Sequence, residues 1–237
     1  MLADSKGDTG LGRLDAEMHL PATAKHAILQ FIAEELSNWR DHPDRPAHEA
    51  EDRLTESLAD HLSSAAYHSA HMNHVKFRTE AGDEVNAKGT MDVSVKPLAQ
   101  TLVIEGRRTT IFETILPIEC KRLPTPGADR DFREYVFSEK KASGGIQRFK
   151  EGKHAAAHTI AGMIGYVQEA TCADWHAHTT KWINGLIAAK QKGWSSGDHL
   201  RLEHEDPRRK VTVLRSSHTR TSRRNDIELC HLWIQMN

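Results

Sequence analysis

The chain has 237 residues, of which 38% are hydrophobic and 27% charged, and these proportions are those of an ordinary globular protein. Its formal net charge of −1 excludes a strongly basic overall field, although a basic groove for nucleic acid is compatible with a neutral total. No apolar run approaches the roughly 18 residues of a membrane span, and three cysteines without a C-x-x-C pair favour a reducing cytoplasm over a disulfide framework.

Hydrophobic periodicity predicts helices and strands in a mixed order. Two amphipathic helices come first, over residues 22–40 and 49–66, and three strand regions follow, over 75–80, 90–97 and 101–123. The later elements are a loop with a short helix over 124–141, a helix over 142–157, a strand over 161–168, a helix over 172–191 and two closing strands over 210–220 and 226–236. This order predicts an α/β fold with one mixed central sheet flanked by helices.

The second helix carries one acid on its apolar side. At about 100° per residue, one face collects Leu54, Leu58, Leu62 and Ala65. Glu51 falls within that stripe, whereas the other acids lie on the opposite, solvated side: Asp52, Glu56 and Asp60. Two interpretations stay open: Glu51 sits in the first turn and favours the helix dipole, or it faces a polar site at the edge of the core.

Charged residues interrupt two of the apolar strands. Asp92 lies on the polar face of the strand over 90–97, and in PIECKRL the alternation of side chains places Glu119 and Lys121 on one face. The opposite face then holds Ile118 and Cys120. Buried charges are rare unless they are paired or coordinate a metal. Two carboxylates and an ammonium that converge suit hydrated Mg²⁺ or Mn²⁺, and a lysine beside the ion can orient or deprotonate an attacking water.

An acid on an early helix, Asp on one strand and Glu-x-Lys on the next resemble the PD-(D/E)XK nuclease superfamily. This resemblance covers residues 49–168 and implies an αβββαβ, restriction-endonuclease-like core with an N-terminal helical extension and a C-terminal hairpin. It implies that Asp92, Glu119 and Glu51 bind metal and that Lys121 serves the attacking water. We accordingly divide the chain into a tail and helix over 1–48 and a nuclease-like domain over 49–237.

Two features depart from the superfamily pattern. Met91 stands where the name-giving proline would be, and the long gap from Asp92 to Glu119 implies an extended hairpin between the two strands. In a different register, Asp83 or Glu84 would replace Asp92, but both lie in a polar, glycine-containing loop and fit less well.

The helix expected over 142–157 carries further candidates. Superfamily members place a polar residue, often Gln, on this helix near the metal, which implies a role for Gln147; a solvated helix face is the alternative. We predict that Arg148 and Lys150 contact phosphate, the part of DNA binding that does not read sequence. A local excess of basic residues would line the groove: Lys140, Lys141, Arg148, Lys150 and Lys153.

The sixteen histidines suggest another type of site. His68, His71 and His74 recur at three-residue spacing, but no nearby Cys or acid completes a structural zinc set. His154 and His158, in HAAAH, lack the intervening Glu of a metalloprotease helix, so we discount them. Three aromatic residues are expected in the core: Trp175, Trp182 and Trp233.

These features together predict a Mg²⁺- or Mn²⁺-dependent DNA nuclease. We expect a cytoplasmic subunit of a restriction or anti-phage defence complex, with DNA and protein partners, no membrane partner, and homo-oligomerisation left open. Two alternatives also stay open. One is a catalytically silent nucleic-acid-binding or scaffold subunit on the same fold, and the other is a structural zinc protein built on the histidines.

Overall fold

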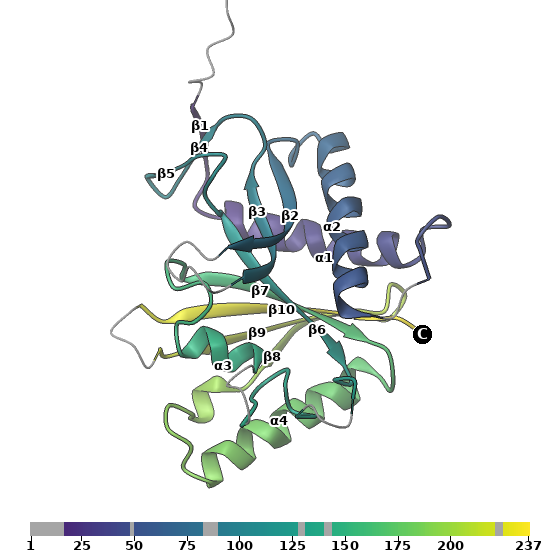
Figure 1. The fold of residues 1–237 in the computed structure, drawn as a ribbon, viewed down its shortest axis with the longest axis vertical. Coiled ribbons are helices and arrows are strands. Elements are labelled where there is room, and N and C mark those ends of the chain that lie inside the picture. The colour runs from purple at the N-terminus through teal and green to yellow at the C-terminus, as the bar shows by residue number, and fades with distance from the viewer. Residues whose placement is uncertain (1–16, 48–49, 83–89, 128–130, 140–143, 221–224) are drawn as a thin grey trace, which may run out of the picture.

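A seven-stranded mixed sheet forms the centre of the structure, in the order β2-β3-β6-β7-β10-β9-β8 (Figure 1). The computed structural model describes residues 17–47, 50–82, 90–127, 131–139, 144–220 and 225–237. The strands of this sheet are β2 (Val75–Gly82), β3 (Thr90–Pro97), β6 (Leu116–Leu123), β7 (Ile160–Val167), β8 (Arg201–Asp206), β9 (Val211–His218) and β10 (Ile227–Gln235). β7 runs parallel to both of its neighbours, β6 and β10, and the other neighbours are antiparallel.

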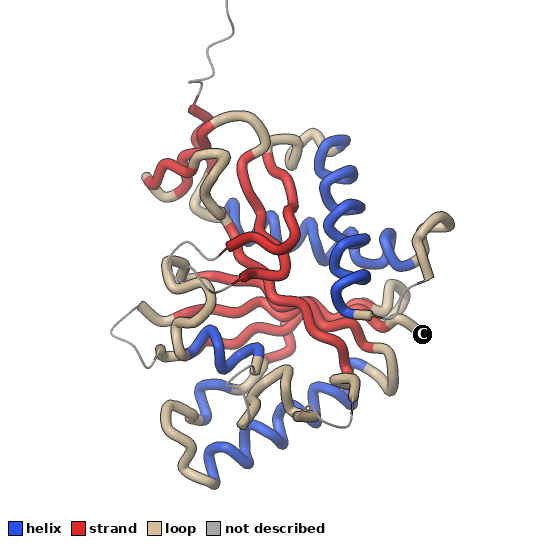
Figure 2. Tube along the Cα trace, in the orientation of Figure 1, coloured by secondary structure: helices blue, strands red, loops and turns tan. Residues whose placement is uncertain are grey.

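Helices cover both faces of the sheet (Figures 1 and 2). α1 (Ala24–Arg40) and α2 (Glu51–His68) pack on one face, and α3 (Gly145–Lys150) and α4 (Cys172–Ala188) pack on the other. The predicted mixed α/β fold is therefore confirmed, because α2, β2, β3, β6, α3 and β7 follow in the expected αβββαβ order. The helix α1 precedes this core and the antiparallel pair β9–β10 closes the chain.

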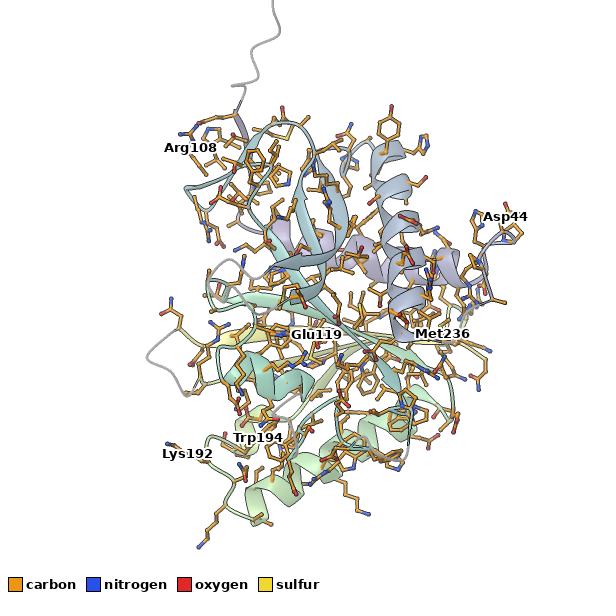
Figure 3. The ribbon with its side chains drawn as sticks, viewed as in Figure 1. Asp44, Arg108, Glu119, Lys192, Trp194 and Met236 are labelled. Atoms are coloured by element: carbon orange, nitrogen blue, oxygen red, sulfur yellow. The ribbon has the colours of Figure 1, made fainter. Side chains whose placement is uncertain are left out.

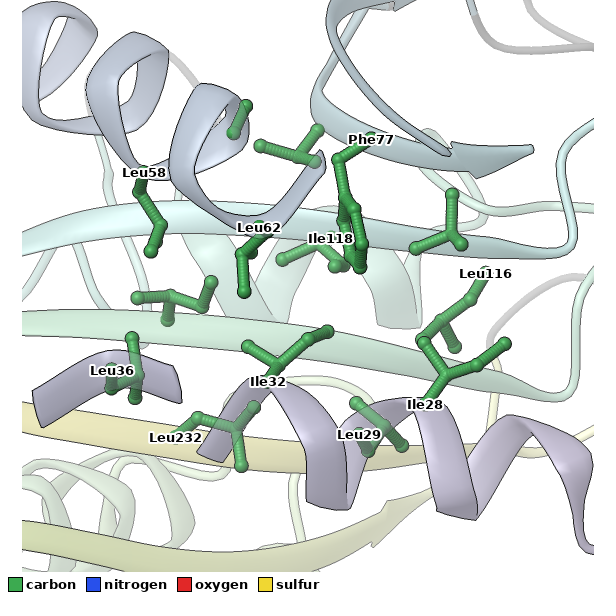
Figure 4. Close-up of a cluster of buried hydrophobic side chains, with 14 of the residues drawn as sticks. Ile28, Leu29, Ile32, Leu36, Leu58, Leu62, Phe77, Leu116, Ile118 and Leu232 are labelled. Atoms are coloured by element: carbon green, nitrogen blue, oxygen red, sulfur yellow. The ribbon is translucent and has the colours of Figure 1, made fainter. Parts of the chain in front are cut away.

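The inward stripe of α2 explains how this helix is fixed. Leu54, Leu58 and Leu62 are fully buried, whereas Asp52 and Glu56 are exposed. Figure 4 shows Leu62 beside Ile118 of β6, and both Leu58 and Leu62 across the core from the apolar side of α1. The labelled residues on that side are Ile28, Leu29, Ile32 and Leu36. Complete burial of one such side chain contributes about 1.5–3 kcal/mol. Residues 48–49, where we placed the boundary between the two parts of the chain, lie outside the described residues.

A second, three-stranded sheet holds the hairpin expected between Asp92 and Glu119. Its order is β1-β4-β5, with β1 (Glu17–Leu20) parallel to β4 (Thr101–Ile104) and β5 (Arg107–Thr109) antiparallel to β4. Glu105 and Gly106 form the turn with φ of 54° and 75°, as a tight two-residue hairpin turn requires. β1 was not predicted.

Three expectations differ from the structure. The helix predicted over 142–157 is wrong beyond α3, because the chain turns after Lys150, with positive φ at Gly152 and Ala155. The short helix expected within 124–141 is not found among the described residues, where 132–136 form turns. β8 was missed because its side chains are mostly exposed on both faces, so that no apolar alternation marks it.

A buried polar chain attaches α3 to the far half of the sheet. The Lys150 ammonium pairs with Asp198, in the short 3₁₀ helix Ser196–Asp198. The Asp198 Oδ1 atom lies 2.6 Å from His218 Nδ1, and Ser216 Oγ lies 2.7 Å from His218 Nε2. Burial raises the pKa of Asp198, but the hydrogen bonds from His218 and Lys150 outweigh it and hold the pKa at about 2.

The same chain continues to β10. Ser216 Oγ lies 2.7 Å from His231 Nε2, His231 Nδ1 lies 2.8 Å from the Tyr135 hydroxyl, and that hydroxyl accepts the Trp233 indole N–H at 2.8 Å. Both histidines complete this pattern when neutral, since Tyr135 then donates to His231, His231 to Ser216, Ser216 to His218, and His218 to Asp198. Burial lowers the pKa of both His218 and His231.

We predict that His218 and His231 reduce the stability of the folded protein on acidification from pH 7 to pH 5. In the unfolded chain, histidines have a pKa of about 6.5 and take up protons in this range, whereas His218 and His231 in the folded protein have lowered pKa values and do not. Each proton that only the unfolded chain binds lowers the free energy of unfolding by about 1.4 kcal/mol per pH unit. Urea unfolding at both pH values measures this slope. His231→Gln should be less stable at pH 7 but show a shallower slope, and an unchanged slope would contradict the explanation.

A substitution of Gly165 in β7 tests how tightly Trp233 packs beside β6, the strand that carries Lys121. A β-carbon there would lie 2.4 Å from Cδ1 and 2.8 Å from Nε1 of Trp233. Gly165→Ala should therefore lower the free energy of unfolding by about 1–3 kcal/mol. Gly185→Ala in α4 is the matched control: its β-carbon meets no atom within 4 Å, and it should raise stability by about 0.5–1 kcal/mol. Equal stability of the two variants in urea unfolding would show that the Trp233 ring can move aside without lowering the free energy of unfolding.

Candidate functional site

The strands β3 and β6 separate where the candidate residues lie. Their pairing runs from Val95 and Leu116 to Val93 and Ile118, and the next residues on each strand are Asp92 and Glu119. Instead of a β3 carbonyl, the carboxylate of Asp92 accepts the backbone N–H of Cys120, with Oδ2 at 2.7 Å. The side chain of Asp92 thus replaces a rung of the sheet ladder and is fixed against β6.

Lys121 brings the predicted acids together. Its Nζ lies 3.1 Å from Glu51 Oε1, 3.1 Å from Glu119 Oε1 and 3.9 Å from Asp92 Oδ2. It also donates to the carbonyl oxygen of Cys120 at 3.0 Å. Glu119 and Lys121 are both buried near the middle of the molecule, where Figure 3 labels Glu119. The structure therefore gathers three predicted acids around the ammonium of Lys121, itself a predicted residue.

Glu51 reaches the site from the first residue of α2. Its Oε2 accepts the backbone N–H of Arg122 at 2.9 Å, while its Oε1 accepts from Lys121. Its side chain keeps 23% of its surface exposed, compared with 0% for Glu119. The sequence left open whether Glu51 faces a polar site at the edge of the core or only favours the helix dipole. These contacts agree with the polar site, and the helix dipole favours a carboxylate at the same position.

Two further residues hold Glu119. Arg148 Nη1 lies 3.1 Å from Oε1, and His154 Nδ1 lies 3.1 Å from Oε2. Arg148 therefore contacts the buried carboxylate, a contact that the sequence did not indicate. His154 was discounted from the sequence. No local spacing identifies it, because it reaches Glu119 only through the turns that follow α3.

The acids at this site have unequal affinities for protons. Burial and the neighbouring Glu119 raise the pKa of Asp92 to about 7, although Lys121 opposes the shift. Burial also raises the pKa of Glu119, but Lys121, His154 and Arg148 outweigh it and hold the pKa at about 2. Burial lowers the pKa of Lys121, yet the three carboxylates together raise it above its usual range. At rest, Glu119 is an anion and Lys121 a cation.

Oxygen donors and an open cleft lie together at this site. A cleft of about 350 Å³ opens beside Asp92 and Glu51; its lining is Glu51, Asp52, Arg53, Thr55, Glu56, Thr79 and Asp92. Carboxylates and the carbonyl of Cys120 are oxygen ligands of the kind Mg²⁺ prefers. Within the described residues, no three His, Cys, Asp or Glu side chains are already arranged as metal ligands, and Lys121 takes the central position.

Gln147 and Lys150 are not brought to this cluster. The amide of Gln147 accepts the Ser138 backbone N–H at 3.1 Å and donates to Glu151 at 2.9 Å. Lys150 is buried, with its ammonium paired to Asp198 and 5.0 Å from the Trp194 ring centre. The expected phosphate contact of Lys150 is therefore wrong, because its ammonium faces the interior.

The remaining residues singled out from the sequence lie away from the Lys121 cluster or outside the described part of the chain. Lys153 is half exposed and paired with Glu151. Four lie outside the described residues: Asp83, Glu84, Lys140 and Lys141. Among the histidines of the zinc alternative, His68 and His71 are exposed at the end of α2 and just beyond it. Trp175 and Trp233 are buried and Trp182 packs against the same core, as expected.

Comparisons with known proteins find no relative whose residues could be matched to this site. No protein-family model matches the chain, and neither the curated proteins nor the solved structures contain a match. In the described part of the chain, no helix has the length and apolar character needed to cross a membrane.

Proposed function

We propose that this protein is a Mg²⁺- or Mn²⁺-dependent DNA phosphodiesterase of the PD-(D/E)XK type. The observation that carries the proposal is the Lys121 ammonium, which lies between Glu51, Asp92 and Glu119 where β3 and β6 separate. The αβββαβ order of the surrounding elements supports it, since the acids and the lysine come from the elements that the resemblance implies.

The acids would hold the cation at the cleft. Asp92 and Glu51 line the cleft and Glu119 is buried beside Lys121, so these three would supply carboxylate oxygens and Cys120 its carbonyl. When bound, a divalent cation supplies Lewis acidity and lowers the pKa of a coordinated water. The net negative charge of three carboxylates beside Lys121 favours such an ion.

Lys121 acts as a cation in this proposal. Because its pKa is raised, the ammonium does not take a proton from water at neutral pH. It instead orients the attacking water by a hydrogen bond and stabilises the charge that develops on the phosphate oxygens. Glu51 and Glu119 fix the position of the ammonium for this role.

The biological setting rests on the superfamily resemblance. We propose a cytoplasmic subunit of a restriction or anti-phage defence complex, with DNA as substrate and other proteins as partners. The alternative is a catalytically silent nucleic-acid-binding or scaffold subunit on the same fold. It is favoured by one observation: the Lys121 ammonium already lies between Glu51 and Glu119, at the centre of the carboxylates that an added cation would need.

Lys121→Ala should bind DNA but lose at least about 100-fold in cleavage rate, because the lysine acts on the transition state. Lys121→Arg should not restore the full rate, since a planar guanidinium does not replace a compact ammonium. Cleavage of plasmid and linear DNA with Mg²⁺, with Mn²⁺ and with chelator measures both variants. Wild-type rates in Lys121→Ala would refute the role of Lys121, and no cleavage by the wild-type protein would favour the silent subunit.

Glu51→Ala should reduce cleavage by at least about tenfold more than Glu56→Ala, although both substitutions remove a carboxylate from α2. Glu51 contacts Lys121, whereas Glu56 is exposed and paired with Arg53. Circular dichroism of both variants controls for folding, and Mn²⁺ titration calorimetry follows the metal site. Equal losses in the two variants would mean that α2 contributes only general negative charge.

A further inference from the structure

Among the described residues of the site, Arg148 is the one cation that both contacts a buried acid and reaches solvent. Its side chain is 29% exposed, whereas Glu119 is fully buried. Among the residues that the structure describes, the guanidinium has Glu119 as its hydrogen-bond partner, through Nη1 alone. Since a guanidinium has five N–H donors, several remain for another acceptor.

Within the described chain, three side chains contact the Glu119 carboxylate, and two of them are cations. Lys121 and Arg148 share Oε1, each at 3.1 Å, and His154 takes Oε2. Lys121 has further carboxylate partners in Glu51 and Asp92, so its charge does not depend on Glu119 alone. Within the described residues, the Arg148 guanidinium has no second carboxylate partner. Arg148 is therefore the cation whose pairing depends most on Glu119.

We propose that Arg148 is exchanged between Glu119 and a DNA phosphate, and that this exchange couples cation binding to DNA binding. This inference rests on the proposed function of the site. Without a cation, Arg148 is paired with Glu119 and contributes little to DNA affinity. With Glu119 directed to a cation, the guanidinium is released and takes a phosphate, for which its planar fork is suited.

The coupling has two consequences. The phosphate contact of Arg148 forms only with cation, so its contribution to DNA affinity differs between the two conditions. Because linkage is reciprocal, DNA that draws Arg148 away from Glu119 strengthens cation binding by the same factor. A residue that merely supports the fold would change DNA affinity equally with and without cation.

The test uses Ca²⁺, which occupies oxygen sites, and measures equilibrium binding of a DNA duplex by fluorescence anisotropy. In Ca²⁺, Arg148→Ala should weaken binding about tenfold, as expected for a charge-assisted hydrogen bond. It should also reduce the slope of log affinity against log salt by about one. In EDTA, both quantities should stay near wild type. Arg208→Ala, which removes an exposed arginine from the turn between β8 and β9, is the matched control.

Two more variants test whether Glu119 is the group that holds Arg148 in the absence of cation. Glu119→Gln, which weakens the hold on Arg148, should bind DNA about tenfold more tightly than wild type in EDTA, and adding Arg148→Ala should remove that gain. Arg148→Lys keeps the charge and should restore part of the Ca²⁺-dependent affinity.

The outcomes separate this inference from the proposed nuclease activity. Equal effects of Arg148→Ala in Ca²⁺ and EDTA, or no effect in either, would overturn the exchange even if the wild-type protein cleaves DNA. The expected pattern without any cleavage in Mg²⁺ would support the exchange and reject the nuclease.

Discussion

The ammonium of Lys121 is the interaction on which the arrangement of the site depends. Removing a charge from water costs several kcal/mol, and partners of opposite charge must offset that cost. Here the partners come from three separate elements, α2, β3 and β6, so the same contacts that keep the ammonium charged also fix these elements relative to one another. The break in the β3–β6 ladder makes room for this group of charges inside an otherwise apolar sheet.

The charges around Lys121 divide the carboxylates into two kinds. Glu119 is enclosed, anionic and saturated with donors, whereas Asp92 is partly exposed and takes up a proton much more readily. The enclosed carboxylate pairs with the cations Lys121 and Arg148, and the partly exposed one lines the cleft. Two chemically similar side chains thus receive different properties from burial and from the number of donors that each accepts.

Local periodicity carried much of the sequence-based prediction. The 100° advance per residue placed Glu51 on the inner side of α2, and the alternation along β6 placed Glu119 beside Lys121; both relations depend only on neighbours in the chain. The contacts of Arg148 and His154 with Glu119, and the burial of Lys150 against Asp198, depend on how α3 and the following turns pack on the sheet. No periodicity encodes such contacts, and the strand β8 escaped prediction because its exposed side chains show no apolar alternation.

The exposed strand β8 lies at one edge of the central sheet. The outer edge of a sheet leaves backbone N–H and C=O groups that another strand can pair with, and this is a common route to aggregation. β8 forms such an edge, and its sequence, RLEHED, places charged or imidazole side chains on both faces. A second strand added there would have to bring its own side chains against these hydrated groups. This edge of the sheet is therefore protected against uncontrolled strand addition, despite the apolar strands that lie directly behind it.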